Sequence, residues 1–504
     1  MLQTTGVALF IGLWALLYLI DAFLKVINGV FIYGVITLLQ QSHAPFDRIY
    51  LRFLTHTGLS VSIGQIRWYT SCFNRMFVRI GSWKPNYLKI WFTLGVCFGL
   101  VAMLLSVFLL SLLVLNTLGK KPVEQQVLTP VMPGVNLPMN QICYYLMTLL
   151  ICGVLHEIGH AIAAVREQVR VNGFGIFVLA LYPGAFVDLY TEHLQQISPI
   201  RQLRIYCAGV WHNFVIVLMA LLILVLLPWI MMPFYSLGNG VVITSVMENS
   251  AVSGPRGLSV GDHLTSVGGC QVKSMAEWAE CIRHSLQGTA SGYCLPLDLL
   301  HQQDIALGSY PTPAGYVECC SNTSNTHLCF YYHSKGTSDV QYACLPARTT
   351  TERLSCKLPS DCYNPNTPAV CVMPSLDNTT RLLRVLHKGR PPLLFLGHPL
   401  DLHYSVVLSD YVPSTSLVPV NLPYVMETFC KYLISLSGAL ALLNVVPCYA
   451  LDGQWILLAF IELSLRSVIS DPEMRGLIYT VLLLFGTILI GTNIIIAMFT
   501  LFVW

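Results

Sequence analysis

Apolar segments long enough to cross a lipid bilayer recur along the chain and restrict what it can fold into. A spanning helix needs about 20 mostly apolar residues, and 55% of the 504 residues are hydrophobic whereas only 11% are charged. Soluble globular domains have about 25% charged residues. The sequence therefore predicts a polytopic α-helical membrane protein. The first predicted spans are Val7–Ile20, Ile90–Leu118, Gln141–Val165 and Ile205–Phe234.

The C-terminal part of the chain is apolar once more, after a polar stretch. It contains three apolar runs, Val425–Val446, Leu451–Leu465 and Leu477–Trp504. Whether these runs cross the bilayer two or three times stays open. At the other end no small-residue cleavage site follows Val7–Ile20, so we interpret this run as a retained span and not as a removed signal peptide.

One apolar piece, Phe174–Val187, is too short for a spanning helix and is interrupted by Gly175, Pro183 and Gly184. Irregular backbone at membrane depth is tolerated only where it is buried in protein or lines a cavity. We therefore expect a re-entrant loop or a strand at this place.

Charged residues indicate how the chain is oriented in the bilayer. Residues 25–90 carry many arginines and lysines against a single acidic residue, Asp47. The positive-inside rule places such a loop in the cytosol, and alternation then places 166–204 inside and 235–425 outside. The formal net charge of +3 is too small to indicate binding to nucleic acid.

The polar stretch 235–425 contains two further signs of a lumenal compartment. Ten of the 17 cysteines lie between Cys270 and Cys371, and the CxxC spacing of zinc knuckles is missing there. Such a cluster indicates disulfides, whose connectivity stays open. Asn322 and Asn378 each begin an Asn-x-Ser/Thr motif, so both are candidate N-glycosylation sites.

One predicted span contains the sequence His156-Glu157-Ile158-Gly159-His160. Residues four apart share a helix face, so both imidazoles can bind one zinc ion, with Glu157 beside them as general base for the water that zinc activates. Ionisable residues in a spanning helix are costly and by default mark a functional site. The alternative is a His/Glu cluster that only holds helices together.

Two histidines leave a zinc ion short of a third protein ligand. Asp452 is an isolated carboxylate among apolar residues, after Pro447, which breaks a helix, and before Gly453, which allows a turn. A buried carboxylate needs a partner, and a zinc ion supplies one. The alternatives are that Asp452 is a helix cap at the membrane edge, or that Cys448 is the third ligand.

These motifs together resemble the site-2 protease family of intramembrane metalloproteases. The resemblance rests on HEIGH in a spanning helix and on Asn444-x-x-Pro447-x(4)-Asp452-Gly453 far downstream. The segments REQVRVNGFGIF, YPGAFVDL, KYLISLSGALA and PCYALDGQWIL are similar to the animal members of the family.

The resemblance implies a role for each residue of the two motifs. It implies His156, His160 and Asp452 as ligands of one zinc ion per chain, and Glu157 as the base that activates water. It also implies that Asn444 lies beside the reacting carbonyl, where an amide group can stabilise an oxyanion.

A third segment looks like the motif that the family carries in the helix after the zinc helix. It reads Ala208-Gly209-Val-Trp-His212-Asn213-Phe. A glycine at this place permits close approach of two helices. Asn213 is expected to orient a ligand or to contact substrate, with plain packing as the alternative, and His212 is expected to be structural.

The beginning of the polar stretch resembles a PDZ domain. The resemblance rests on the segment Gly240–Val246, the turn Gly261-Asp262 and the side chain Trp278, with a cysteine-rich insertion at about 290–375 splitting the domain. PDZ domains bind a peptide strand at a sheet edge. A steric filter over the entrance of the active site is the other role that we consider.

We therefore expect a polytopic α-helical membrane protein with a re-entrant or strand element by the active site. A lumenal PDZ-like α+β domain with a disulfide-rich insertion is expected beside it. The predicted regions are 1–117, with N-terminal spans and a basic cytosolic loop, 118–234, with the HEIGH core, 235–425, with the PDZ-like domain, and 426–504, with the C-terminal spans and the aspartate motif.

The family resemblance also implies a function. It implies a zinc-dependent endopeptidase of the Golgi that cuts transmembrane segments of membrane-anchored transcription factors, of the sterol regulatory element-binding protein type, after a first lumenal cleavage. A catalytically inactive scaffold or a zinc-handling membrane protein are the alternatives. A transporter needs ligands along a path, whereas this sequence has one compact cluster, and an inactive scaffold should have lost part of that set.

Overall fold

The structure is a computed structural model, and it describes residues 14–21, 23, 53–54, 56–62, 64–118, 141–180, 182–254, 257–287, 291–306, 308–320, 326–333, 339–362 and 368–503. Within these residues the chain divides into two compact units. The first unit combines Met1–Val225 with Met426–Trp504, and the second unit is Leu226–Val425.

Five described helices are long and apolar enough to cross a membrane. These helices are α4 (Pro85–Leu118), α5 (Ile142–Arg166), α8 (Ala208–Met231), α13 (Leu422–Asn444) and α15 (Pro472–Val503). They confirm the prediction of a multi-pass membrane protein. Half of the predicted span Val7–Ile20 lies outside the described residues, as do residues 119–140 of the next loop and part of the predicted basic loop.

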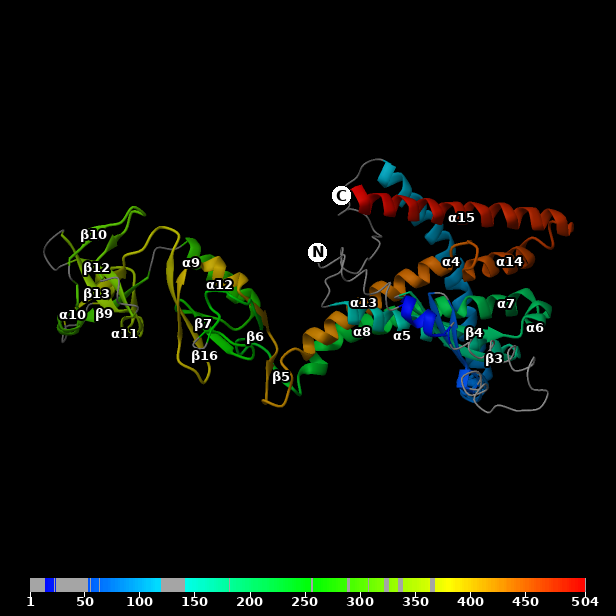
Figure 1. The fold of residues 1–504 in the computed structure, drawn as a ribbon, viewed down its shortest axis with the longest axis horizontal. Helices are drawn as coiled ribbons and strands as arrows, with labels where there is room; N and C mark the ends of the chain where they lie inside the picture. The colour runs from blue at the N-terminus through cyan, green and yellow to red at the C-terminus, as the bar shows by residue number, and fades with distance from the viewer. Residues whose placement is uncertain are drawn as a thin grey trace, which may run out of the picture. The chain divides into compact units, whose positions relative to one another are not determined.

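The C-terminal region contains two long helices and a shorter one between them. The short helix α14, Asp452–Ser464, has 13 residues, which is fewer than a crossing needs. Figure 1 shows α14 between α15 and α7, with α15 running past α4 in the same unit. Two long helices therefore follow residue 421, and α14 packs inside the unit.

Short helices connect the long ones in the first unit. These are α3 (Asn74–Gly81), α6 (Thr191–Gln196) and α7 (Pro199–Tyr206). Helix α7 packs against α14, α5 and α4. It therefore contacts both α5, which carries HEIGH, and α14, which begins at Asp452. The buried side chains Leu203, Val210, Ile456 and Leu457 belong to the core that holds these helices together.

A four-stranded antiparallel sheet lies in the same unit. Its strands are β1 (Leu59–Ser62), β2 (Gln65–Thr70), β3 (Val171–Leu179) and β4 (Tyr182–Leu189), in the order β1-β2-β3-β4. The segment Phe174–Val187 thus lies in the hairpin of β3 and β4. Strand β4 is at the edge of the sheet and packs against α5.

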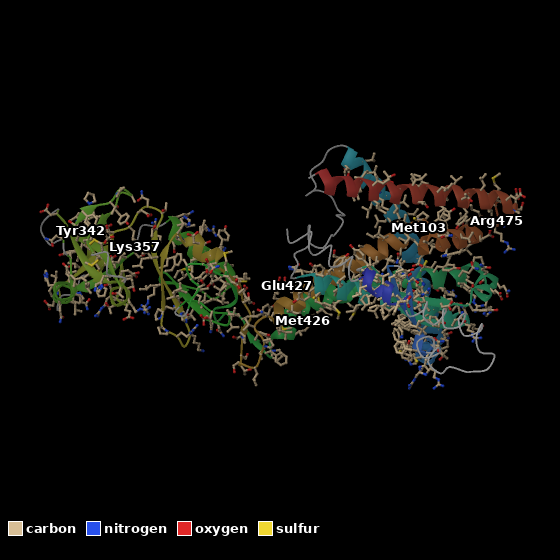
Figure 2. The ribbon with its side chains drawn as sticks, in the orientation of Figure 1. Met103, Tyr342, Lys357, Met426, Glu427 and Arg475 are labelled. Carbon is tan, nitrogen blue, oxygen red and sulfur yellow. A yellow bond between two sulfur atoms is a disulfide. The ribbon has the colours of Figure 1, made fainter. Side chains whose placement is uncertain are left out.

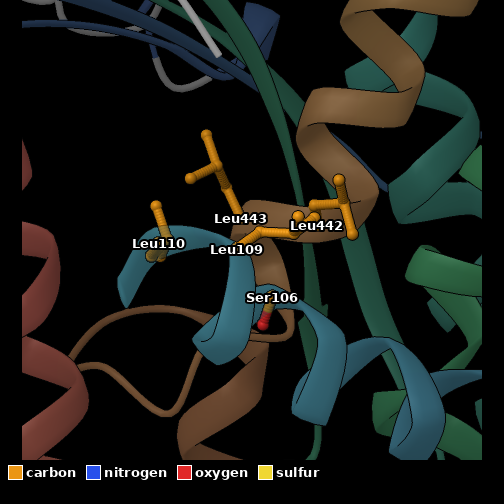
Figure 3. Close-up of a pocket in the computed structure, with 5 residues that line it drawn as sticks. All are labelled: Ser106, Leu109, Leu110, Leu442 and Leu443. Atoms are coloured by element: carbon orange, nitrogen blue, oxygen red, sulfur yellow. The ribbon is translucent and has the colours of Figure 1, made fainter. Parts of the chain in front are cut away.

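A small apolar pocket lies between α4 and α13. It is lined by Ser106, Leu109 and Leu110 of α4 and by Leu442 and Leu443 of α13, as Figure 3 shows. The one polar side chain, Ser106, bonds to the carbonyl of Met103 in its own helix. The pocket therefore offers dispersion contacts and no free polar group.

The second unit contains a sheet whose strands come from both of its ends. The order is β17-β16-β7-β6-β18, and β8 (Cys270–Gln271) pairs with β7. The strands are β6 (Val241–Val246), β7 (His263–Val267), β16 (Arg381–His387), β17 (Leu393–Gly397) and β18 (Val406–Ser409). Helices α9 (Met275–Gln287) and α12 (Pro399–Tyr404) cover this sheet, with Trp278 fully buried in the core. A short pair, β5 (Tyr235–Ser236) and β19 (Val412–Pro413), accompanies it.

The chain between α9 and β16 forms a separate sheet of order β13-β12-β15-β9-β14. Its strands are β9 (Gly292–Pro296), β12 (His327–His333), β13 (Val340–Pro346), β14 (Ser355–Cys356) and β15 (Ala369–Pro374). The pair β10 (Tyr310–Pro311) and β11 (Val317–Glu318), helices α10 (Leu297–Gln303) and α11 (Ala347–Thr350) and the 3-10 helix η4 (Pro359–Cys362) complete this part, in which Figure 2 labels Tyr342 and Lys357.

The predicted disulfides are confirmed in this unit. All ten of its cysteines are paired, and the other seven cysteines of the chain are free. The pairs are Cys270–Cys281, Cys294–Cys362, Cys319–Cys329, Cys320–Cys344 and Cys356–Cys371. Four of the pairs hold the inserted sheet together, and the fifth joins β8 to α9.

Candidate metal centre

Three potential metal ligands meet inside the first unit. His156 and His160 point from one face of α5 toward Asp452, the first residue of α14. The Asp452 Oδ2 atom lies 2.9 Å from His156 Nε2 and 3.2 Å from His160 Nε2, and the two Nε2 atoms lie 3.1 Å apart. Both histidines are buried, whereas the Asp452 side chain is 24% exposed. The two distant motifs thus form one cluster.

Glycines allow the elements that surround this cluster to approach closely. A Cβ atom on Gly209, in α8, would lie 2.6 Å from His156 Cε1. A Cβ on Gly453 would lie 2.5 Å from the Val445 carbonyl oxygen, in the turn that leads to Asp452. Real Cβ atoms do not approach other atoms so closely. Larger residues at either place would displace the backbone that carries or faces the ligands.

The hydrogen bonds of His160 indicate which of its nitrogens faces the cluster without a proton. Its Nδ1 atom lies 2.7 Å from the Ile205 carbonyl oxygen, which can only accept, so Nδ1 carries a proton. In the neutral imidazole Nε2 then has a free lone pair. This lone pair faces a second imidazole nitrogen and a carboxylate oxygen, so an added cation satisfies all three groups.

Asn213 performs the matching role for His156. Its Nδ2 atom lies 3.1 Å from His156 Nδ1, and its Oδ1 atom is buried without a hydrogen-bond partner. The two amide positions have the same shape and are assigned from the hydrogen-bond network. Exchanging them lets Oδ1 accept a bond from His156 Nδ1–H, and this tautomer leaves Nε2 free for a metal ion. The donor set therefore fits a zinc ion.

Glu157 lies beside the cluster on the next position of α5. It is half-buried, and its Oε2 atom accepts a hydrogen bond of 3.0 Å from the Val187 N–H group at the edge of β4. The bond holds the carboxylate between the three potential metal ligands and the edge strand. The N–H of Val187 points away from β3. Ala185 lies two residues earlier in β4, so its backbone N–H and C=O groups point to the same side as those of Val187.

Asn444 and Cys448 occupy different surroundings. The Asn444 Nδ2 atom lies 3.2 Å from His156 Nε2, at the last residue of α13. Cys448 packs with Leu110, Val446 and Leu489 in an apolar cluster, and it is not among the residues whose ligand atoms converge. Another convergent cysteine group among the described residues belongs to disulfides.

Several groups at this centre were not singled out from the sequence. They include the Ile205 carbonyl, the Val187 N–H and Ser437, whose hydroxyl donates a bond of 3.1 Å to the backbone carbonyl of Asn213. Gly486 of α15 is another, since a Cβ there would lie 2.9 Å from the Pro447 carbonyl carbon. Backbone groups are common to all residues and give no sequence signal, and Gly486 has no local motif around it.

The two candidate glycosylation sites lie in the second unit. Asn378 is exposed in a turn between β15 and β16. The side-chain and backbone groups of Thr379 and Thr380 bond to the Asp377 carboxylate beside it and lower the pKa of this carboxyl to about 2. Asn322 lies outside the described residues.

Comparisons with known proteins agree with this arrangement. The profile of peptidase family M50 matches residues 144–489, more than half of the chain. The "Membrane-bound transcription factor site-2 protease homolog" of Arabidopsis thaliana is 28% identical over 449 residues, covering 79% of this chain and 84% of that relative. The family match extends from α5 to α15 and so includes both histidines and Asp452. The chain therefore belongs to peptidase family M50, the intramembrane metalloproteases of the site-2 protease type.

Proposed function

We propose that this protein is a zinc-dependent endopeptidase that hydrolyses a peptide bond within transmembrane segments. The convergence of His156, His160 and Asp452 beside Glu157 carries the proposal, because the cluster lies among helices long enough to cross a membrane. His160 is six residues from the end of α5, about 9 Å along a helix axis. We propose that water reaches the centre from this near membrane surface, the cytosolic one in the proposed orientation.

His156, His160 and Asp452 would hold the zinc ion. When bound, zinc polarises the substrate carbonyl and lowers the pKa of the attacking water. Glu157 accepts a proton from this water as it attacks, and then transfers the proton to the leaving amide nitrogen. Asn213 and the Ile205 carbonyl keep the two imidazoles in the tautomer that presents Nε2 to the metal.

Asn444 is proposed to stabilise the negative charge that develops on the carbonyl oxygen. Its amide group lies 3.2 Å from His156 Nε2, so its N–H donors are at the ligand cluster. Donors that are already oriented before the reaction stabilise an oxyanion strongly in a dry site.

The edge of β4 is proposed to bind the unwound substrate as an added strand. A helical peptide bond is shielded by its own hydrogen bonds, and an extended segment exposes it. Next to β4 there is open space beside Gly153 of α5, because a Cβ on this glycine would have only the Ala185 nitrogen within 4 Å, at 3.8 Å. This space lies one helical turn before Glu157, where the substrate backbone would need room.

Zinc content of the purified protein tests the metal site. We expect about one zinc ion per chain in the wild type and in Cys448→Ala, and loss of zinc in His156→Ala and Asp452→Ala. Glu157→Gln is expected to keep zinc and to lose cleavage of a transmembrane substrate in detergent. A folded wild type without zinc, or full cleavage by Glu157→Gln, contradicts the mechanism.

The proposed substrates are membrane-anchored transcription factors of the sterol regulatory element-binding protein type, first trimmed on the lumenal side. The name of the Arabidopsis relative refers to membrane-bound transcription factors. We propose a Golgi location, with residues 235–425 in the lumen and glycans on Asn322 and Asn378. The five disulfides of the second unit suit an oxidising lumen.

The second unit is proposed to be a PDZ-like domain that admits only trimmed substrates. Strands β6 and β7 precede the disulfide-rich insertion, and β16 and β18 return to the same sheet after it, which supports a PDZ-like domain split by an insertion. Deletion of 240–425 is then expected to permit cleavage of untrimmed substrates. The zinc content of the deletion variant shows whether its membrane unit still folds, and unchanged selectivity in a zinc-loaded variant contradicts the filter.

A further inference from the structure

Four exposed basic side chains lie around the start of α4, in the first unit. Arg75 and Arg79 are on α3, Lys84 directly precedes α4, and Lys89 is in its first turns. Arg75 and Arg79 are four residues apart and therefore share one helix face. We call these four residues the basic collar.

Aromatic side chains accompany the basic collar. Trp83 and Tyr87 are both 58% exposed, and the Lys84 Nζ atom lies 5.1 Å from the centre of the Trp83 ring. Tryptophan and tyrosine are enriched where a spanning helix meets the headgroup region. Helix α4 has 34 residues and extends for about 51 Å, so its first turns reach a membrane surface.

Helix α3 has the form of a helix that lies in the membrane surface. Its buried residues are Gly81, which faces α5, and Phe77, which packs on Phe174 of β3. Met76 and Ile80 on the flank are 40% and 38% exposed. Arg75 and Arg79 are on the side away from this buried stripe. An amphipathic helix of this kind places its apolar flank among acyl chains and its basic side among phosphates.

No acidic side chain is paired with the basic collar in the described part of the chain. No acidic residue occurs in the sequence between Asp47 and Glu124. Four clustered cations at a membrane surface attract anionic headgroups.

We propose that the basic collar is a binding surface for the headgroups of anionic phospholipids, such as phosphatidylserine. The surface is connected to the end of the zinc-site helix. A Cβ on Gly81 would lie 2.8 Å from Val165 Cβ, and Arg166 Nε donates a bond of 2.8 Å to the Pro85 carbonyl.

Binding of short-chain lipids to the detergent-purified full chain tests the proposal. Dihexanoyl-phosphatidylserine, dihexanoyl-phosphatidylcholine and inorganic phosphate are compared by native mass spectrometry at low salt. We expect phosphatidylserine to bind most tightly. In the double variant Arg75→Gln with Arg79→Gln, each removed charge is expected to weaken the binding of phosphatidylserine about fivefold. Arg75→Lys with Arg79→Lys should keep the preference, because the charge remains.

A matched pair on the second unit serves as the control. Arg353 and Lys357 are also exposed, and Arg353→Gln with Lys357→Gln is expected to leave binding unchanged. Unaltered binding in the Arg75 and Arg79 variant, or equal binding of phosphatidylcholine, overturns the proposal. Inorganic phosphate that binds as tightly as phosphatidylserine overturns it as well, since the surface would then select a free anion. Circular dichroism of each variant checks that the fold is kept.

Discussion

At the scale of single residues, the proposed metal centre depends on groups that bring the potential ligands together without being ligands themselves. Gly209 leaves room for both imidazoles, and Asn213 and the Ile205 carbonyl are proposed to determine their tautomers. Each acts by geometry, so a substitution should alter zinc affinity while the fold stays intact.

Gly209→Ala is expected to lower zinc affinity strongly, because its new Cβ would lie 2.6 Å from His156 Cε1 and would displace the ring. Gly438→Ala is the matched control, since a Cβ there would lie 3.8 Å from Val217 Cγ2, an ordinary contact. Competition with a fluorescent chelator measures both affinities. Equal zinc affinity of the two variants would show that the close approach at Gly209 does not matter.

Asn213→Leu is expected to weaken zinc binding by about 10- to 100-fold, the usual effect of removing the partner of a metal-bound histidine. The substitution removes the acceptor for His156 Nδ1–H and leaves this donor buried. Asn213→Asp keeps an acceptor oxygen at the same place and is expected to bind zinc almost as the wild type does. The same chelator assay decides, and wild-type affinity in Asn213→Leu would refute the amide orientation given above.

At the scale of secondary-structure elements, three pieces position the centre: β4, α7 and the turn before α14. The edge of β4 orients Glu157 through the Val187 N–H. Helix α7 packs between α5 and α14 and supplies the Ile205 carbonyl. These contacts predict that changes beside β4 affect substrate entry, whereas changes that move α7 affect zinc affinity.

Gly153→Leu is expected to slow cleavage without loss of zinc, because its side chain fills the space next to the Ala185 backbone. Gly153→Ala is the control: its Cβ would make an ordinary contact at 3.8 Å, and alanine favours the helix. Cleavage rate and zinc content are measured in parallel. If Gly153→Leu cleaves as fast as Gly153→Ala, the substrate does not use this space.

Glu167→Gln is expected to weaken zinc binding roughly tenfold, through a shift of α7. Glu167 is buried and bonds to Arg201 Nε at 2.8 Å and to Arg204 Nη1 at 3.2 Å, and Ile205 follows directly. Removing one partner of a buried pair leaves an uncompensated charge. Glu280→Gln, in an exposed pair with Arg283, should leave zinc affinity unchanged. Zinc affinity is measured in the folded fraction of each variant. If Glu167→Gln and Glu280→Gln bind zinc equally well, Glu167 does not position α7 for the metal site.

At the scale of the whole molecule, the two units are stabilised by different means. Disulfides hold the second unit, whereas packed helices and the proposed zinc ion hold the first. A structural disulfide contributes typically about 2–5 kcal/mol to a small secreted domain. A metal ion stabilises only the unit that binds it.

Reduction of the disulfides is therefore expected to expose protease sites within 226–425 and to leave zinc content unchanged. Chelation of zinc is expected to destabilise the first unit and to leave the cleavage pattern of 226–425 as it was. Limited proteolysis followed by mass spectrometry locates the cuts. Loss of zinc on reduction would mean that the two units depend on each other for stability.

The sequence by itself determined the elements and residues whose signal is local. The long apolar runs predicted α4, α5, α8 and α13, and the four-residue spacing of His156 and His160 predicted a shared helix face. Composition predicted the disulfide framework in the same way. Each of these features depends on hydrophobicity or spacing within one segment, which can be read without knowledge of the fold.

Only the tertiary structure decided what meets across the chain. It placed Asp452 at both histidines and Cys448 in an apolar cluster, paired the ten cysteines, and made Leu451–Leu465 a short packed helix. It also brought the Ile205 carbonyl and the Val187 N–H to the centre. The physical reason is that every residue carries the same backbone groups, so only their position in space gives two of them a function.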